Sequence, residues 1–291
     1  MLTREDLREI RSIEIRTRRL VHDQLAGSYH SVFKGRGMSF DTVRVYQPGD
    51  DIRRIDWNVS ARTSEVHVKE FVEERELTVM ILVDMSGSLD FGTRTESKRR
   101  LAAKLAALLA FSAIENNDRV GLVLFTEEVE RYIPPKKGRK HVLRLLSEIM
   151  TFKPAHRGTS INTCMEFLLR VARRKAVAFL VSDFHDEGPQ KALRIAAGRH
   201  DLIPVILEDP MEQALPNLGM AWMEDAETGE VLPVPTHMRG FRRRFQENCT
   251  ANREALDTLF RRLKMDAIRL ETGESLHRPL LNYFKLRAKR A

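Results

Sequence analysis

The residues best suited to chemistry lie in one short loop after an apolar segment. Residues 77–88 read LTVMILVDMSGS, so a stretch typical of a buried strand ends directly in an Asp-x-Ser-x-Ser loop. The loop offers one carboxylate and two hydroxyls, from Asp84, Ser86 and Ser88. Oxygen ligands of this kind suit a hard divalent cation such as magnesium. Open α/β sheets also place their binding crevices at the carboxyl ends of strands, so the loop predicts a metal site.

Two more oxygen-bearing residues follow in loops farther along the chain. Thr159 lies in the glycine-containing loop HRGTSIN before a predicted helix, and Asp183 follows the apolar segment AFLVS. Loops that follow different strands of a doubly wound sheet converge at the same edge. We therefore expect one magnesium ion, with manganese as the alternative, to be surrounded by Asp84, Ser86, Ser88, Thr159 and Asp183.

This set of donors favours binding over catalysis. Magnesium takes six oxygens at about 2.1 Å and keeps several waters. Two carboxylates and three neutral hydroxyls leave the ion under-neutralised, with one position open for an aspartate or glutamate of a protein partner. Catalytic magnesium sites more usually place carboxylates directly on the metal beside substrate phosphates. The pattern therefore predicts a non-enzymatic protein-binding module.

From residue 77 onward, apolar strands alternate with helices, which predicts a Rossmann-like, mostly parallel α/β sheet. The strands are rich in Val, Ile, Leu and Phe without strict alternation, as expected when helices cover both faces. The predicted strands of the sheet are Leu77–Val83, Arg119–Phe125, Val129–Ile133, Ala176–Val181, Leu202–Leu207 and Asp266–Leu270. The predicted helices are Glu96–Asn116, His141–Thr151, Ser160–Arg173, Gly188–Gly198, Met238–Leu263 and Ser275–Arg287.

The remaining segments predict a small α+β annex and an inserted hairpin. A helix is expected from Thr3 to about Leu25, followed by strands near Val43 and at Val66–Val72. Two short apolar segments flank the turn-like sequence DAETGE and predict a hairpin outside the main sheet. We divide the chain into an annex at 1–75, the α/β domain at 76–291 and, within that domain, a hairpin excursion at 218–236.

Composition is consistent with a folded protein of the cytoplasm. The chain has 291 residues, 42% of them hydrophobic, and a formal charge of +8 that is compatible with several kinds of acidic partner. Two cysteines far apart argue against a disulfide framework or a structural zinc site. The charged amino terminus lacks the apolar core of a signal peptide. The most apolar helical stretch, Leu105–Ile114, is shorter than the roughly 20 residues that span a bilayer.

Several of these sequence blocks resemble known families. DMSGS, the threonine of RGTS and the aspartate of VSDF resemble the metal-ion-dependent adhesion site, or MIDAS, of von Willebrand factor A domains. The blocks GRGMSFDTVRVYQPGDDIRRIDWNVSAR, ENNDRVGLVLF and YIPPKKG resemble the MoxR-associated family known as domain of unknown function 58. That likeness runs from about Val32 to the final helix, and the PGDDIRRIDW block is its most specific part.

The resemblance implies a Rossmann-like fold with a magnesium ion at its upper edge, used to bind proteins. It also implies a partner, because family members tend to be encoded beside MoxR-type AAA+ ATPases, which suggests chaperoning, complex assembly or metal insertion. One departure is visible in the threonine loop, where Arg157 and Ser160 replace a glycine and an aspartate that are more usual in A domains. This difference bears on the ion's affinity and on the shape of the docking rim.

Two functions of other classes remain open. A metal-dependent phosphohydrolase would use Asp84 and Asp183, with His185 as acid or base, although further metal ligands at suitable spacing are lacking nearby. The alternative interpretation of His185 is a histidine at the rim of the metal site that takes no part in chemistry. A nucleic-acid-binding protein would use the basic runs ESKRR, Arg239–Arg244 and KLRAKRA, which we interpret instead as solvated helix faces.

A charged block in the annex has a structural and a functional interpretation. The segment from Arg44 to Trp57 combines arginines, aspartates and aromatic residues. Pro-Gly followed by aspartates has an obvious role in a turn and a helix cap, so we interpret most of the block as structural. A possible second interaction surface remains, and its candidate residues, together with those at the rim of the metal site, are Arg53, Arg54, Arg157 and His185.

Overall fold

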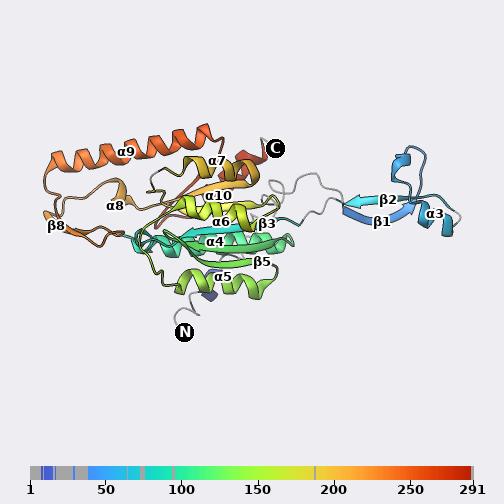
Figure 1. Ribbon diagram of the computed structural model, residues 1–291, viewed down its shortest axis with the longest axis horizontal. Coiled ribbons are helices and arrows are strands. Elements are labelled where there is room, and N and C mark those ends of the chain that lie inside the picture. Colours follow the sequence, from blue (N-terminus) through green and yellow to red (C-terminus); the bar gives the residue numbers. More distant parts are fainter. Residues whose placement is uncertain are drawn as a thin grey trace.

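A six-stranded sheet forms the centre of the protein in a computed structural model (Figure 1). The structure describes residues 8, 10–15, 17, 29, 39–63, 65–72, 76–93, 96–186 and 188–289. The strand order is β10-β7-β6-β3-β4-β5. These strands are β3 (Thr78–Asp84), β4 (Arg119–Phe125), β5 (Val129–Lys136), β6 (Val177–Ser182), β7 (Asp201–Glu208) and β10 (Ile268–Glu271).

Neighbouring strands of the sheet run parallel except for β4 and β5, which pair antiparallel. Residues 126–128 alone connect these two strands. A parallel connection needs a crossover of a dozen or more residues, so such a short loop permits only a hairpin. The predicted mostly parallel, Rossmann-like sheet is confirmed, and the predicted strand that began at Val129 extends beyond Ile133 to Lys136.

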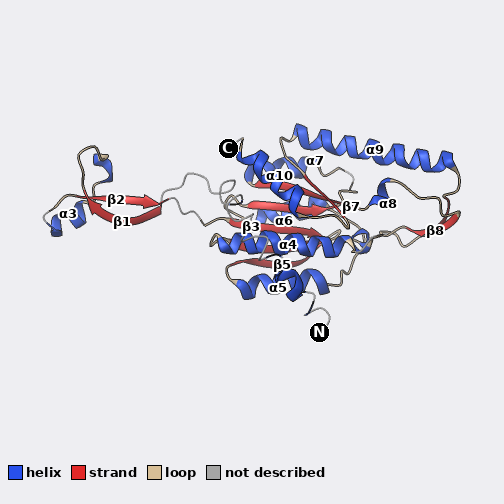
Figure 2. Cartoon of the chain, turned by 180° about the vertical axis from the view of Figure 1, so that it is seen from behind, coloured by secondary structure: helices blue, strands red, loops and turns tan. Residues whose placement is uncertain are grey.

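Helices cover both faces of the sheet (Figures 1 and 2). One face carries α4, α5 and α10, and the other carries α6, α7 and α9. These helices are α4 (Lys98–Glu115), α5 (Arg139–Thr151), α6 (Ile161–Val171), α7 (Gln190–Arg199), α9 (Arg239–Arg262) and α10 (His277–Ala288). The helices predicted from residue 96 onward are confirmed, with limits that differ by a few residues.

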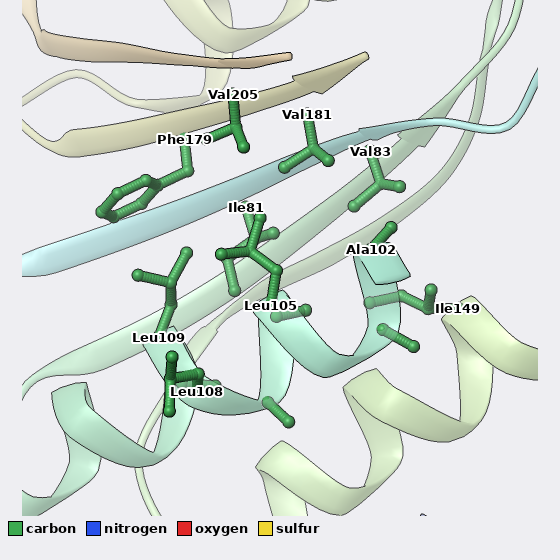
Figure 3. Close-up of a cluster of buried hydrophobic side chains, with 14 of the residues drawn as sticks. Ile81, Val83, Ala102, Leu105, Leu108, Leu109, Ile149, Phe179, Val181 and Val205 are labelled. Atoms are coloured by element: carbon green, nitrogen blue, oxygen red, sulfur yellow. The ribbon is translucent and has the colours of Figure 1, made fainter. Parts of the chain in front are cut away.

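Alternation along β3 shows why the sheet has two cores. Val79, Ile81 and Val83 belong to the cluster under α4 and α5, whereas Met80 and Leu82 belong to the cluster under α6 and α7. Successive side chains of a strand point to opposite faces, so a strand with helices on both sides must be apolar throughout. Figure 3 shows the first of these clusters, in which Ile81 and Val83 lie against side chains of α4.

The annex contains a two-stranded antiparallel sheet of β1 (Ser39–Val45) and β2 (His67–Val72). The short helices η2 (Ile52–Arg54) and α3 (Trp57–Thr63) lie between them. Figures 1 and 2 show the annex beyond one end of the six-stranded sheet. Most of the helix predicted from Thr3 to Leu25 lies outside the described residues, but residues 10–15 within it are helical.

The charged block of the annex makes local contacts. Both carboxylate oxygens of Asp50 accept from Arg44 at 2.7 Å, which fixes the turn after β1. The Asp51 side chain accepts from the Arg53 backbone N–H at 3.0 Å and so caps η2. These contacts agree with the predicted turn-and-cap role of the aspartates.

The predicted hairpin is present and stands apart from the main sheet. It consists of β8 (Met220–Glu224) and β9 (Val231–Pro235), which pair with each other in an antiparallel register. The short helix α8 (Pro210–Gln213) precedes it and α9 follows it. Because β7 and β10 pair directly with each other in the sheet, the segment between them is an insertion, as the sequence predicted.

Candidate metal centre

The candidate site lies where the direction of winding in the sheet changes. From β3 the chain proceeds to β4 and β5 on one side, and then returns to β6 on the other side. Loops at such a point diverge and leave a crevice at the carboxyl edge. Asp84 is the last residue of β3, and Asp183 directly follows β6, which pairs with β3. The topology therefore brings the two carboxylates to one place.

Asp84 is fully buried and is held by neutral groups. Its Oδ1 accepts from the Ser86 backbone N–H at 2.9 Å, and its Oδ2 accepts from the Ser182 hydroxyl at 2.6 Å. The Thr159 hydroxyl lies 3.5 Å from the same Oδ2. Burial, followed by the nearby charge of Asp183, raises the pKa of Asp84 to about 6. The carboxylate thus lies in surroundings that are short of positive charge.

Asp183 has the opposite environment. Its Oδ2 accepts from the Lys98 ammonium at 3.1 Å, and the His185 backbone N–H lies 3.5 Å from Oδ1. Burial alone would raise the pKa of Asp183, but the Lys98 charge and the hydrogen bonds, one of them from Ser88, outweigh burial and lower it. Lys98 also forms an ion pair with Glu212 of α8. The fold therefore supplies its own cation to this carboxylate.

Lys98 corrects one prediction from the sequence. The sequence predicts a solvated basic face at ESKRR, yet the Lys98 side chain is 0% exposed. Lys98 is the first residue of α4, directly after the cap Ser97, and points its ammonium at the carboxyl edge of the sheet. Nothing in the local pattern separates Lys98 from the arginines that follow it. Its partners are 85 and 114 positions away in the chain, so only the tertiary fold identifies it.

The hydroxyls complete the predicted set. The Ser86 and Ser88 hydroxyl oxygens lie 3.1 Å apart. The loop that carries them is joined to the threonine loop, because the Gly87 backbone N–H donates to the Arg157 carbonyl at 2.9 Å. Thr159 follows within that loop and reaches Asp84 as described above. The structure thus gathers the predicted residues Asp84, Ser86, Ser88, Thr159 and Asp183 around one crevice.

The inserted hairpin also reaches this crevice. The Thr159 hydroxyl donates to Oε1 of Glu227 at 3.3 Å, and Glu227 lies in the turn between β8 and β9. Arg157 lies 3.6 Å from Glu224 at the end of β8. The sequence predicts the hairpin as an excursion, but no local pattern in it connects its turn to the loops that carry Ser86, Ser88 and Thr159. Two glutamates in DAETGE were the available signal, but acidic turns are common on protein surfaces.

The candidate rim residues fall into two separate groups. Arg157 and His185 are exposed and belong to the loops that carry Thr159 and Asp183. Arg53 and Arg54 are exposed in η2 of the annex. The annex lies at one end of the sheet and β8 at the other (Figures 1 and 2). The structure therefore does not bring the two annex arginines to the candidate metal centre.

The chemistry of the donors fits a hard cation such as magnesium or manganese and not zinc. Two buried carboxylates and three hydroxyls are oxygen donors of the kind that magnesium prefers. Within the described ranges, no group of three or more His, Cys, Asp or Glu side chains is arranged to hold a metal ion. A zinc-type hydrolase site normally needs such a group, so the described residues lack one.

Comparison with known proteins identifies relatives along most of the chain. The model of the family described as "Protein of unknown function DUF58" matches residues 42–255. The chain is 35% identical over 227 residues to uncharacterized protein Rv1480 of Mycobacterium tuberculosis, covering 76% of this chain and 71% of that protein. It is 29% identical over 108 residues to uncharacterized protein YeaD of Bacillus subtilis, covering 37% of this chain and 25% of that protein.

Solved structures give more distant likenesses. The conserved hypothetical protein BatB from Bacteroides thetaiotaomicron has 17% identity and a TM-score of 0.48, over 73% of this chain and 99% of that chain. A von Willebrand factor type A protein from Catenulispora acidiphila has 16% identity and a TM-score of 0.38, over 77% and 44% of the two chains. The fold assignment rests on the strand order described above. Within the described residues, every helix is too short or too polar to span a bilayer.

Proposed function

The chain belongs to the DUF58 family of proteins of unknown function, and on that premise we propose that it is a non-enzymatic, metal-dependent protein-binding module. The observation that carries this proposal is the environment of Asp84. Its carboxylate is fully buried at the sheet edge, and its contacts from the described residues come from neutral hydroxyls and a backbone N–H. A buried anion without a paired cation is costly, and a divalent cation at this position would relieve that cost.

The chain's own residues would contribute to the binding of such an ion in two ways. Ser86, Ser88 and Thr159 would offer neutral oxygens, while Asp84 and Asp183 would supply negative charge. The ion, when bound, supplies positive charge for an acidic side chain of a partner. Because Lys98 already neutralises part of the charge of Asp183, the residues leave the ion with an excess of positive charge. That excess favours recruitment of a further carboxylate.

The partner class that we propose is a MoxR-type AAA+ ATPase or its client, in chaperoning or complex assembly. The family resemblance of the PGDDIRRIDW block supports this class. Arg157, exposed at the crevice beside Glu224, supplies a positive charge at the rim, and positive charge steers acidic groups toward a site. The annex arginines Arg53 and Arg54 would then belong to a separate contact, remote from the ion.

Magnesium binding to Asp84→Ala tests the proposed site. Isothermal titration calorimetry on the wild-type chain should show binding of magnesium, and Asp84→Ala should abolish it because the buried negative charge is lost. Asp90→Ala is the matched control, since Asp90 lies in the same loop but pairs with Arg99 at the surface. Asp90→Ala should bind like wild type. Unchanged ion uptake in Asp84→Ala would reject the assignment.

The partner is tested by capture with a purified MoxR-type AAA+ ATPase. We expect the wild-type chain to retain this protein in magnesium and to lose it when a chelator is added. Asp84→Ala should fail to retain it in either buffer. Retention that ignores both the chelator and the substitution would show that the contact does not pass through the metal.

The phosphohydrolase alternative has less support from the geometry. A metal-dependent hydrolase usually binds its metal through more His or carboxylate ligands than Asp84 and Asp183, and the described residues hold no group of three or more such side chains arranged for a metal ion. A phosphoester screen with magnesium or manganese separates the two functions, since turnover that is lost in Asp183→Ala would favour the enzyme.

For the nucleic-acid alternative, binding that falls steeply with salt would be the supporting result.

A further inference from the structure

We propose that Glu227, in the turn of the β8–β9 hairpin, is an internal ligand of the candidate metal centre. Its carboxylate would fill the position that is open to an acidic side chain of a partner. This inference rests on the proposed metal-dependent binding function and specifies how the site is regulated. A partner would have to displace a carboxylate that belongs to the chain itself.

A single hydroxyl connects Glu227 to the buried end of the site. Thr159 Oγ1 lies 3.3 Å from Glu227 Oε1 and 3.5 Å from Asp84 Oδ2. The hairpin carboxylate and the strand carboxylate therefore approach the same threonine oxygen, one of the predicted ligands. Glu227 is partly buried in this arrangement, whereas its neighbours Asp225 and Thr228 are exposed. The turn thus directs the Glu227 side chain inward.

The turn is fixed in the conformation that presents Glu227. The Asp225 side chain accepts from the backbone N–H groups of Glu227 and Thr228, each at 2.9 Å. The Gly229 N–H donates to the Asp225 carbonyl at 2.8 Å, and Gly229 has a positive φ of 74°, which favours glycine. An Asx turn of this kind holds the backbone locally. The orientation of Glu227 is therefore built into the hairpin.

The hairpin also contacts the Asp-x-Ser-x-Ser loop directly. A Cβ atom placed on Gly87, between Ser86 and Ser88, would lie 1.9 Å from the carbonyl oxygen of Ala226. Only glycine permits this approach of two backbones. Beside it, Arg157 of the threonine loop lies 3.6 Å from Glu224. The residue before Glu227 thus touches the loop that carries two of the predicted ligands.

Charge explains why this contact would depend on the ion. Glu227 is partly buried and lies near Asp183, so the negative charges of the two carboxylates repel each other. The described residues hold no group of three carboxylates arranged directly around one ion. Glu227 and Asp84 would instead share the ion through the Thr159 hydroxyl that both approach, while Asp183 is paired with Lys98. Like charges repel across low-dielectric surroundings. A divalent cation between them converts that repulsion into attraction and holds the turn in place.

Manganese binding to the full chain tests the inference. Manganese is the probe because water-proton relaxation reports both its affinity and the number of waters that it keeps. Glu227→Gln should weaken binding by roughly tenfold, as loss of a supporting carboxylate commonly does, and should raise relaxation per bound ion because water takes the vacated position. Glu230→Gln is the matched control. It lies in the same turn and is exposed, so it should behave like wild type.

The outcomes separate this inference from the proposed function. Glu227→Gln with the affinity and water content of wild type would overturn the internal ligand and leave the metal site standing. Failure of wild type to bind manganese, or binding that survives Asp84→Ala, would overturn both. Glu227→Asp is a second variant that keeps the charge but shortens the side chain. We expect Glu227→Asp to bind manganese more weakly as well. Wild-type affinity in this variant would contradict the proposal that the longer glutamate side chain reaches the ion.

Discussion

The two sides of the crevice differ in how they balance a buried carboxylate. On the β6 side, Asp183 forms an ion pair with the fully buried Lys98. On the β3 side, Asp84 accepts hydrogen bonds from neutral groups, and burial together with Asp183 raises its pKa to about 6. Residues of the same type, one strand apart, thus have pKa shifts of opposite direction.

This contrast indicates that Asp183 has mainly a structural role and Asp84 a role in ligand binding. A carboxylate that the fold neutralises is part of the structure, and removing its partner should cost stability. A carboxylate left without a cation contributes less to stability, and a buried group of this kind in a cleft is a candidate for a functional site. Substitutions on each side, and at the hairpin above them, test this division.

The largest effect is expected from Lys98→Met. The substitution leaves Asp183 and Glu212 without their shared ammonium, in a place where Lys98 is 0% exposed. Removing one partner of a buried ion pair costs about 3–5 kcal/mol. Urea denaturation followed by circular dichroism measures the free energy of unfolding. Lys137→Met, which removes a surface pair with Glu76, is the control and should leave stability unchanged. A loss as small as the control's would contradict the supporting role of Lys98.

An intermediate effect is expected from Gly87→Ala. Its Cβ would collide with the backbone of Ala226 in the hairpin turn, so the turn must move. Overpacking of this kind costs about 1–3 kcal/mol. The same denaturation measurement applies, and limited proteolysis should cut the hairpin sooner. Gly198→Ala on α7 meets nothing within 4 Å and should be neutral or slightly stabilising. Equal behaviour of the two variants would show that the hairpin is not seated on Gly87.

The smallest effect on stability is expected from Asp84→Asn. In a chelating buffer, the free energy of unfolding should fall by only about 1 kcal/mol. Asparagine can still accept from the Ser86 N–H but loses the hydrogen bond from the Ser182 hydroxyl, and removal of the repulsion from Asp183 offsets part of that loss. Magnesium should stabilise wild type by mass action but not this variant. Asp183→Asn is the matched comparison and should lose more stability, because it breaks the pair with Lys98. Equal losses of stability in Asp84→Asn and Asp183→Asn would show that the two carboxylates do not differ in their importance to the fold.

Much of the sheet and of the crevice could be predicted from the sequence. Apolar segments such as residues 78–84 and 119–125 must be buried on both faces, which fixes strands and their order of appearance. Polar residues at their carboxyl ends then converge for topological reasons. For this reason the sequence alone predicts that Asp84, Thr159 and Asp183 meet at one edge of the sheet.

Contacts between distant parts of the chain could not be predicted in the same way. The pairing of Lys98 with Asp183, the hydrogen bond from Ser182 to Asp84 and the approach of Glu227 each join residues with no local pattern in common. A buried lysine within a charged run looks like a surface lysine until its partners are placed. The antiparallel direction of β5 was the exception, since the short loop at 126–128 already requires it.

The helix that follows the hairpin, α9, connects it to the loop beside Asp183. Short hydrogen-bonded connections tie α9 to the hairpin, including Met238 N–H to the Pro235 carbonyl at 3.1 Å. Near its other end, Phe260 packs edge-to-face against Phe184, the residue after Asp183, with ring centroids 5.3 Å apart. About 30 Å of helix separates these contacts. The helix therefore joins the hairpin to the loop beside Asp183 by a second route, separate from the contact between Gly87 and Ala226.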